Sequence, residues 1–346
     1  MHELIHNEGE GRREPGLLDP GAVELPPPRG WFSIGSVEDT PPGAVRNHRI
    51  AGHDLVAFRG ADGVLAVADA FCPHLGAHLG HGGRVEGNDL RCPFHGFCFD
   101  RSGACTRTGY NTRPPPKARL RTWPTIERHG VSLVYYDPEG TPPRFEIPDV
   151  SMEGWSPLLF HHWRLRGHPQ ETSENSVDIG HFQYIHNYSE VRALEPLVVD
   201  GAHLKARYAF SRPLPGLLGR RLLLNHSIEV DVYGLGYSRV DVHETRTGLR
   251  VRSLVLCTPR GDGEIDLRAA VALRDPRCDR DTPPWLRAAA PVLLSKAARR
   301  ALLMQYCHDV EQDFVIWKNK RHIPIPALAL GDGPLGAFRK WAKQFY

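Results

Sequence analysis

The sequence predicts an α+β protein with two domains: an N-terminal all-β domain, and a second domain in which helices cover an antiparallel sheet. Three observations support this prediction. The 346 residues suffice for about two ordinary domains. Residues 31–136 read as short strands separated by turns, and the residues after 150 include longer alternating strands. Residues 283–320, rich in Ala, Leu, Lys and Arg, form the strongest helical segment.

The limits of the domains follow from composition. Residues 1–28, rich in Gly, Pro and Glu, predict a flexible arm. Residues 53–72 predict two strands joined by a Gly-containing turn, and residues 130–140 predict another strand. A proline-rich stretch then suggests a boundary near residue 148. The first domain would therefore cover residues 29–148 and the second residues 149–346.

The second domain is expected to be a mixed domain. An early helix is predicted around residues 174–188, and a long late helix over residues 283–320. Alternation of apolar and polar residues predicts long antiparallel strands, packed on one face. These strands are expected over residues 203–212, 226–244, 249–260 and 264–274.

Composition excludes several classes of protein. A net charge of +3 is too mild to indicate a nucleic-acid partner. No stretch approaches the ~18 apolar residues of a membrane span, and the polar N-terminus has no signal-peptide core. Seven cysteines are too few for a disulfide-rich secreted protein of this size. We therefore expect a cytoplasmic protein with no membrane span.

Four of the cysteines crowd into residues 72–105, and two of them stand beside histidines. Cys72 and His74 form a C-x-H pair, and Cys92 and His95 form a C-x-x-H pair. Zinc sites more often pair Cys with Cys and His with His. The mixed pairs suit a cluster with two unlike irons, one of which takes both thiolates and the other both imidazoles. The pattern predicts a Rieske [2Fe–2S] cluster on these four residues.

A second set of possible metal ligands lies in the early helix, ENSVDIGHFQYIHNY. A Rieske cluster carries one electron and does no chemistry on carbon, so it needs a redox partner or a second metal. His181 and His186 are the natural pair, because two histidines and one carboxylate hold Fe(II) and leave positions open for O2 and substrate. Their spacing separates them by about 140° on an ideal helix. We therefore expect the helix to be widened or broken between them.

The third ligand is expected to come from another segment. Asp178 is better placed to accept from the ring N–H of His181 than to bind the metal. The late helix offers Asp309, Glu311 and Asp313, although a solvated helix face would also explain such an acidic run. Asp313 is favoured because apolar residues follow it, and an unpaired carboxylate among them would be costly. Asp309 is the alternative.

The two motifs together resemble those of the Rieske non-heme iron oxygenases, over nearly the whole chain except the arm. Asn175, Asp178, His181 and His186 form the pattern N-x-x-D-x-x-H-x-x-x-x-H. The resemblance implies a homotrimer in which each iron receives electrons from the cluster of a neighbouring subunit. It makes Asp178 the bridge between His181 and the neighbour's His95, with Asn175 in the same site.

Within that family, three stretches are most similar to the steroid and sterol branch: CPHLGAHLG, HPQETSENSVDIGHF and GPLGAFRKWAKQFY. That branch includes the cholesterol 7-desaturases and the 3-ketosteroid 9α-hydroxylases. The resemblance implies a monooxygenase that uses O2 to hydroxylate, desaturate or oxidatively demethylate a hydrophobic polycyclic substrate, a sterol or steroid. A demethylase of a smaller aromatic or natural-product substrate is the alternative. A non-catalytic Rieske electron carrier is a third hypothesis.

The source of electrons is expected to be another protein. The chain has no G-x-G-x-x-G fingerprint in a strand–turn–helix setting and no plant-type ferredoxin cysteine set. Electrons from NAD(P)H would therefore arrive through a separate reductase, directly or by way of a ferredoxin.

Overall fold

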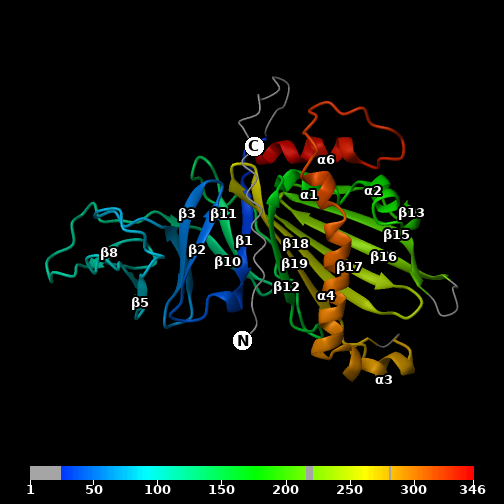
Figure 1. Cartoon of the computed structure of the whole chain (residues 1–346), viewed down its shortest axis with the longest axis horizontal. Helices are drawn as coiled ribbons and strands as arrows, with labels where there is room; N and C mark the ends of the chain where they lie inside the picture. Colours follow the sequence, from blue (N-terminus) through cyan, green and yellow to red (C-terminus); the bar gives the residue numbers. More distant parts are fainter. Residues whose placement is uncertain (1–24, 216–220, 280–281) are drawn as a thin grey trace.

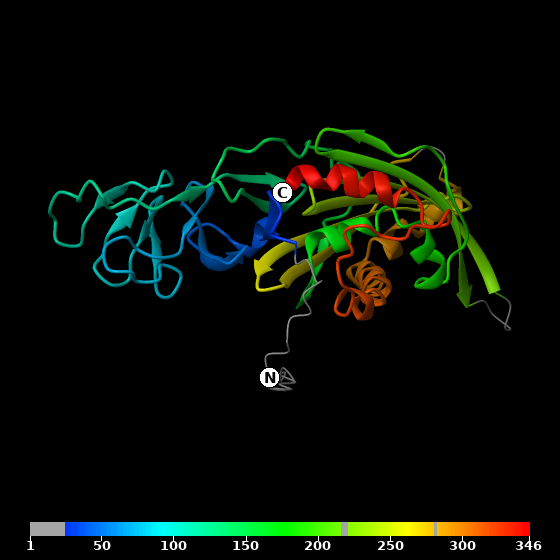
Figure 2. The same ribbon diagram turned by 90° about the horizontal axis from the view of Figure 1, so that it is seen from above.

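The computed structural model describes residues 25–215, 221–279 and 282–346. Most of the arm predicted over residues 1–28 therefore lies outside the described residues. The described chain is elongated, with small β-sheets at one end and a large sheet accompanied by helices at the other (Figure 1, Figure 2). This arrangement confirms the predicted α+β class.

The N-terminal domain consists of short antiparallel strands, as predicted. They are β1 (Gly30–Ser36), β2 (Val45–Ile50), β3 (His53–Arg59), β4 (Leu65–Asp69), β5 (Arg84–Glu86), β6 (Asp89–Arg91), β7 (Cys98–Phe99), β8 (Cys105–Arg107), β9 (Thr122–Trp123), β10 (Thr125–Arg128) and β11 (Val131–Tyr136), with a 3₁₀ helix at Val37–Asp39. They form three sheets, ordered β1-β11-β10, β2-β3-β4-β9 and β5-β6-β7-β8. The hairpin predicted over residues 53–72 is present as β3 and β4.

The second domain is organised around one antiparallel sheet. Its strands are β12 (Leu159–Arg166), β13 (Ser189–Ala193), β14 (Val198–Asp200), β15 (His203–Pro215), β16 (Arg221–Tyr233), β17 (Tyr237–Glu244), β18 (Arg250–Gly261) and β19 (Glu264–Leu273). Their order is β12-β19-β18-β17-β16-β15-β13, and β14 pairs with β15. Strands are present in all four stretches predicted over residues 203–274, but residues 226–244 form two strands, β16 and β17, because the chain turns at Gly234, which has a φ of 63°. The predicted set lacks β12, β13 and β14, whose residues show no clean apolar–polar alternation.

Helices accompany the large sheet (Figure 1). They are α1 (Pro169–Glu174), α2 (Ile179–Tyr184), α3 (Pro284–Leu293), α4 (Lys296–Glu311), α5 (Phe314–Trp317) and α6 (Leu335–Ala342), followed by a 3₁₀ helix at Lys343–Phe345. The late helix predicted over residues 283–320 is thus divided into α3, α4 and α5. The first interruption lies at Ser295, whose side chain accepts a hydrogen bond from the amide of Ala298. Ser295 is therefore the N-cap of a new helix, α4.

The two domains share a buried interface. Trp31 of β1 packs with Tyr237 and Leu254 of the large sheet. The hydroxyl of Thr258 donates to the carbonyl of Ser33 across the interface, over 2.7 Å.

Between β11 and β12 the chain has no regular helix or strand. We propose to retain the boundary near residue 148, within that segment. Among the described residues, no helix is both long and apolar enough to cross a membrane.

Candidate functional site

Two loops of the N-terminal domain carry the cluster motif, and they share one backbone pattern. Cys72 follows β4 and Cys92 follows β6. In each loop the Cys amide donates to the carbonyl five residues later, over 2.8 Å. Gly76 and Gly96, four residues after their cysteines, donate back to the Cys carbonyls over 2.9 and 3.2 Å. Both glycines have positive φ, which a residue with a Cβ rarely adopts. The two loops therefore hold their ligands in matching turns.

The four side chains of the motif form an inner pair and an outer pair. The thiols of Cys72 and Cys92 are buried, whereas the imidazoles of His74 and His95 are half-buried. The two rings meet edge to face with their centroids 4.8 Å apart. Burial raises the pKa of Cys72, and the neighbouring Cys92 raises it further. A pair of thiols beneath a pair of imidazoles fits the ligands of a Rieske cluster.

The two histidines of the second motif are brought together by the end of a helix. His181 lies in α2, which ends before His186. Asn187, at a φ of 56°, then turns the chain, and the two imidazole centroids lie 5.1 Å apart. The predicted break between the histidines is confirmed. The single early helix is divided once more at Asp178, which has extended backbone between α1 and α2.

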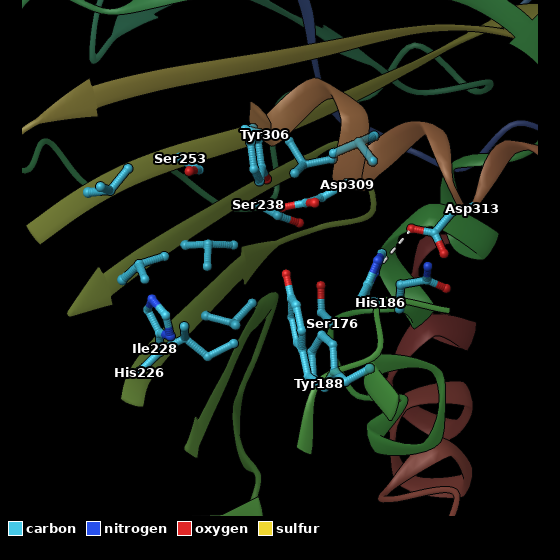
Figure 3. A pocket seen from close by; sticks show the side chains of 18 of the residues that line it. Ser176, His186, Tyr188, His226, Ile228, Ser238, Ser253, Tyr306, Asp309 and Asp313 are labelled. Atoms are coloured by element: carbon cyan, nitrogen blue, oxygen red, sulfur yellow. Dashed lines mark ion pairs between the residues drawn. The ribbon is translucent and has the colours of Figure 1, made fainter. Parts of the chain in front are cut away.

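Asp313 approaches the histidines from the interruption between α4 and α5. Its Oδ2 lies 3.7 Å from Nε2 of His186 (Figure 3). One ligand atom from each of His181, His186 and Asp313 lies within 4.8 Å of the others. Burial raises the pKa of Asp313, although the neighbouring His186 and the side chain of Asn175 lower it. A buried carboxylate is costly unless a cation balances its charge. Together with the two histidines it fits the ligand set of Fe(II).

The hydrogen bonds of the two imidazoles leave the same nitrogen free on each ring. Nδ1 of His181 lies 2.5 Å from the backbone carbonyl of Asp178, and Nδ1 of His186 lies 3.0 Å from Oε1 of Gln312. Because both partners are carbonyl oxygens, which only accept, each Nδ1 carries the hydrogen. Burial lowers the pKa of His181 to about 4, with His186 as the next cause. Nε2 of each ring is therefore available to a metal.

Asp178 makes a different contact with His181 from the one predicted. Its carboxylate accepts the backbone amide of His181 over 3.1 Å, which makes Asp178 the N-cap of α2. The ring N–H of His181 bonds instead to the Asp178 backbone carbonyl. The predicted contact between carboxylate and imidazole is therefore wrong, because the N-cap position holds the carboxylate against the backbone. Burial raises the pKa of Asp178.

The other acids of the late helix have partners of their own. Both carboxylate oxygens of Asp309 accept from Arg212, at 2.9 Å each. The carboxylate of Glu311 accepts from the indole N–H of Trp163 over 2.9 Å. Of these three acids, Asp313 is the one that lies beside the histidines.

A cavity of about 320 Å³ opens beside His181, His186 and Asp313. Alternate residues of β16, β17 and β18 form its wall, because side chains two apart on a strand face the same side of a sheet. Most of this wall is apolar and branched, and it includes Ile228, Val230, Val240, Val242, Val251 and Val255. In Figure 3, His186 and Asp313 lie at one end of this space.

Sequence reasoning does not identify several polar residues of the site. Gln312 holds His186, and Tyr188, Arg212 and His226 line the cavity. Proximity in the sequence could have indicated two of them: Gln312 directly precedes Asp313, and Tyr188 follows His186 by two residues. Arg212 and His226 lie on strands, where only the paired register brings them to the cavity.

Family models match both parts of the chain. The model described as the 3-ketosteroid 9alpha-hydroxylase C-terminal domain matches residues 134–346, and the Rieske [2Fe-2S] domain matches residues 30–124. A probable 3-ketosteroid-9-alpha-monooxygenase, oxygenase component, from Rhodococcus rhodochrous is 30% identical, over 92% of this chain and 79% of that protein. A cholesterol 7-desaturase of Xenopus laevis is 29% identical, over 93% of this chain and 73% of that protein.

Solved structures share the fold. Dicamba monooxygenase bound to dicamba superposes with a TM-score of 0.65 at 18% identity, covering 91% of this chain and 96% of that one. NdmA of Pseudomonas putida CBB5 with caffeine gives a TM-score of 0.65 at 18% identity, covering 90% and 89%. At this identity the likeness is evidence of the fold.

Proposed function

Because this chain belongs to the 3-ketosteroid 9α-hydroxylase family of Rieske oxygenases, we propose that it oxidises a sterol or steroid with O2. The observation that carries this proposal is the apolar cavity beside His181, His186 and Asp313. Its volume of about 320 Å³ falls within the ~300–1,000 Å³ typical of pockets for drug-sized ligands. Relatives named for steroid substrates support a polycyclic substrate.

We propose that the two candidate metal sites have separate roles. The Rieske ligands are Cys72, His74, Cys92 and His95, and the iron ligands are His181, His186 and Asp313. When bound, the cluster would supply single electrons and the iron would supply an open position for O2. The chain's own contribution is to present Nε2 of both histidines, to keep Asp313 beside them, and to exclude water with the apolar wall.

The proposed assembly is a homotrimer in which one chain's cluster serves the iron of the next. The two candidate centres lie in different domains of an elongated chain (Figure 1). Exposed apolar side chains lie in the segments of both: Leu75 and Phe94 in the cluster loops, and Tyr184 and Ile316 in the helices that carry or follow the candidate iron ligands. We propose that these side chains take part in the contacts between subunits. We propose that Asp178 completes the electron path there, with its backbone carbonyl bonded to the ring of His181 and its carboxylate toward the neighbour's His95.

The electron donor is proposed to be a separate reductase that takes electrons from NAD(P)H, with or without a ferredoxin. The relatives' designation as oxygenase components supports this division of labour. We place the protein in the cytoplasm, because reducing conditions preserve the thiols of Cys72 and Cys92.

The test is turnover by the holoenzyme with its reductase. Sterols, 3-ketosteroids and aromatic ethers are offered in parallel, and oxygenated, desaturated or demethylated products are identified by mass spectrometry. We expect product from a sterol or ketosteroid, and none from the His186→Ala variant. Product from the aromatic ethers alone would contradict the steroid proposal. Three irons per chain are expected, whereas an electron carrier would hold two.

A further inference from the structure

One polar side chain in the cavity wall has an unsatisfied atom. Among the described residues that line the cavity, His226 alone has a buried side-chain nitrogen or oxygen without a hydrogen-bond partner, its Nδ1. A buried polar atom without a partner is costly, and it needs an explanation such as a missing ligand.

The two cross-strand neighbours of His226 do not supply a bond to Nδ1. His226 lies on β16, opposite Phe210 on β15 and Glu244 on β17. Phe210 stacks on the imidazole, with centroids 5.2 Å apart and planes 19° apart. The carboxylate of Glu244 already accepts the amides of Arg246 and Thr247, over 3.1 and 2.7 Å, and the Thr247 hydroxyl. The stacking fixes the plane of the ring in the cavity wall, where Nδ1 has no partner.

The charge state of the ring limits what it can bind. Burial lowers the pKa of His226 and outweighs the nearby carboxylate of Glu244 and the backbone of Leu224, which raise it. The ring is therefore neutral at pH 7, with one N–H donor and one acceptor nitrogen. A neutral imidazole in an apolar wall complements an uncharged oxygen, because a ketone accepts from the N–H and a hydroxyl bonds to either nitrogen.

The position of His226 indicates which end of a ligand it meets. Figure 3 shows the imidazole across the cavity from His186 and Asp313, beside Ile228. The apolar wall lies between the two ends. A rigid polycyclic ligand that reaches the iron ligands with one part would bring its remote end to His226.

We infer that His226 is a specificity-determining residue that binds a ketone or hydroxyl oxygen on the part of the substrate remote from the iron ligands. This inference rests on the proposed function, since it assumes a polycyclic substrate in the cavity. It adds to the proposed function a required ketone or hydroxyl oxygen, which distinguishes a substrate from a hydrocarbon of the same shape.

Equilibrium binding to the holoenzyme tests the inference without turnover. The ligands are 5α-androstan-3-one, 5α-androstan-17-one and the parent 5α-androstane. His226→Phe keeps a planar ring against Phe210 but removes both nitrogens, and His226→Gln keeps a donor and an acceptor. We expect the wild type to bind one of the ketones about 3- to 10-fold more tightly than the hydrocarbon, as for one neutral hydrogen bond. His226→Phe should lose that preference, and His226→Gln should retain part of it.

Ile228→Val is the matched control, because it alters the same strand and the same wall without changing polarity. It should keep the preference for the ketone. Each variant is accepted only with a wild-type Rieske spectrum and melting temperature. A ketone preference that survives in His226→Phe overturns the inference. If the wild type binds none of the three steroids, the proposed steroid function fails instead.

Discussion

The two candidate metal sites are built by opposite strategies. In the N-terminal domain, two short loops with one backbone pattern each deliver one thiol and one imidazole. In the second domain, the three candidate iron ligands come from interrupted helices: His181 within α2, His186 after its end, and Asp313 between α4 and α5. The cluster ligands are fixed by local turns, whereas the iron ligands depend on where two separate helices stop.

This difference has a consequence for how each site tolerates change. Hydrogen bonds within a few residues shape each cluster loop, so the loop is largely determined by its own sequence. At the candidate iron site, His186 is oriented by Gln312, which comes from another segment. We therefore expect the iron site to be lost independently of the cluster.

The largest effect should come from removing ligands. Asp313→Ala should lose one iron per chain and all turnover, while the visible Rieske spectrum remains. His95→Ala should lose the cluster itself, because it removes one of the two imidazoles that the mixed ligand set requires. Iron analysis and electron paramagnetic resonance of the reduced protein distinguish the two results. Asp309→Ala is the matched control and should retain three irons, since Asp309 is paired with Arg212. Loss of iron from that control, with none from Asp313→Ala, would reverse the assignment of the carboxylate.

The sequence predicts the cluster site more completely than the iron site, because one is built from local turns and the other from separate helices. The cluster motif is local, so the types and spacing of its four residues are sufficient for the prediction. The iron ligands require tertiary structure. A helix break between His181 and His186 is predictable from their spacing, but the contact with Asp313 depends on the packing of segments far apart in the chain. Ser295 marks a helix start that the strong helical composition around it conceals.

The second prediction concerns the proposed link between the two sites. Asp178→Asn keeps the size of the side chain and can still cap α2 through its carbonyl oxygen. It removes the charge that would bind an imidazole across the subunit contact. A charge-assisted hydrogen bond is worth ~1.5–3 kcal/mol, so electron transfer should slow by about 10- to 100-fold. The measurement is reoxidation of the pre-reduced cluster after substrate and O2 are added.

Iron content and trimer mass, from light scattering, serve as controls for this variant and should match the wild type. Reoxidation at the wild-type rate would show that Asp178 acts as a helix cap alone.

A smaller effect is expected from the side chain that orients one histidine. Gln312→Leu removes the acceptor for Nδ1–H of His186, whereas the equivalent partner of His181 is a backbone carbonyl that no side-chain change removes. Loss of such a partner lowers metal affinity about 10- to 100-fold. Titration of the iron-depleted site with Co(II) measures that affinity. Gln312→Glu restores an acceptor and should recover much of it. Equal affinity in wild type and Gln312→Leu would mean that His186 is held by packing.

The smallest effect should distinguish the two cluster loops. Alanine at Gly76 or Gly96 must adopt a positive φ, which costs ~1–2 kcal/mol. A Cβ at Gly76 would meet no other atom within 4 Å, so this backbone cost should be the whole effect. A Cβ at Gly96 would also lie 3.1 Å from Cα of Gly109, a backbone atom that cannot move aside easily. Denaturation of the holoprotein should therefore show a larger loss of stability for Gly96→Ala than for Gly76→Ala. Equal losses would show that the second loop shifts to accommodate the methyl group. The two loops, which share a backbone pattern, would then tolerate alanine equally.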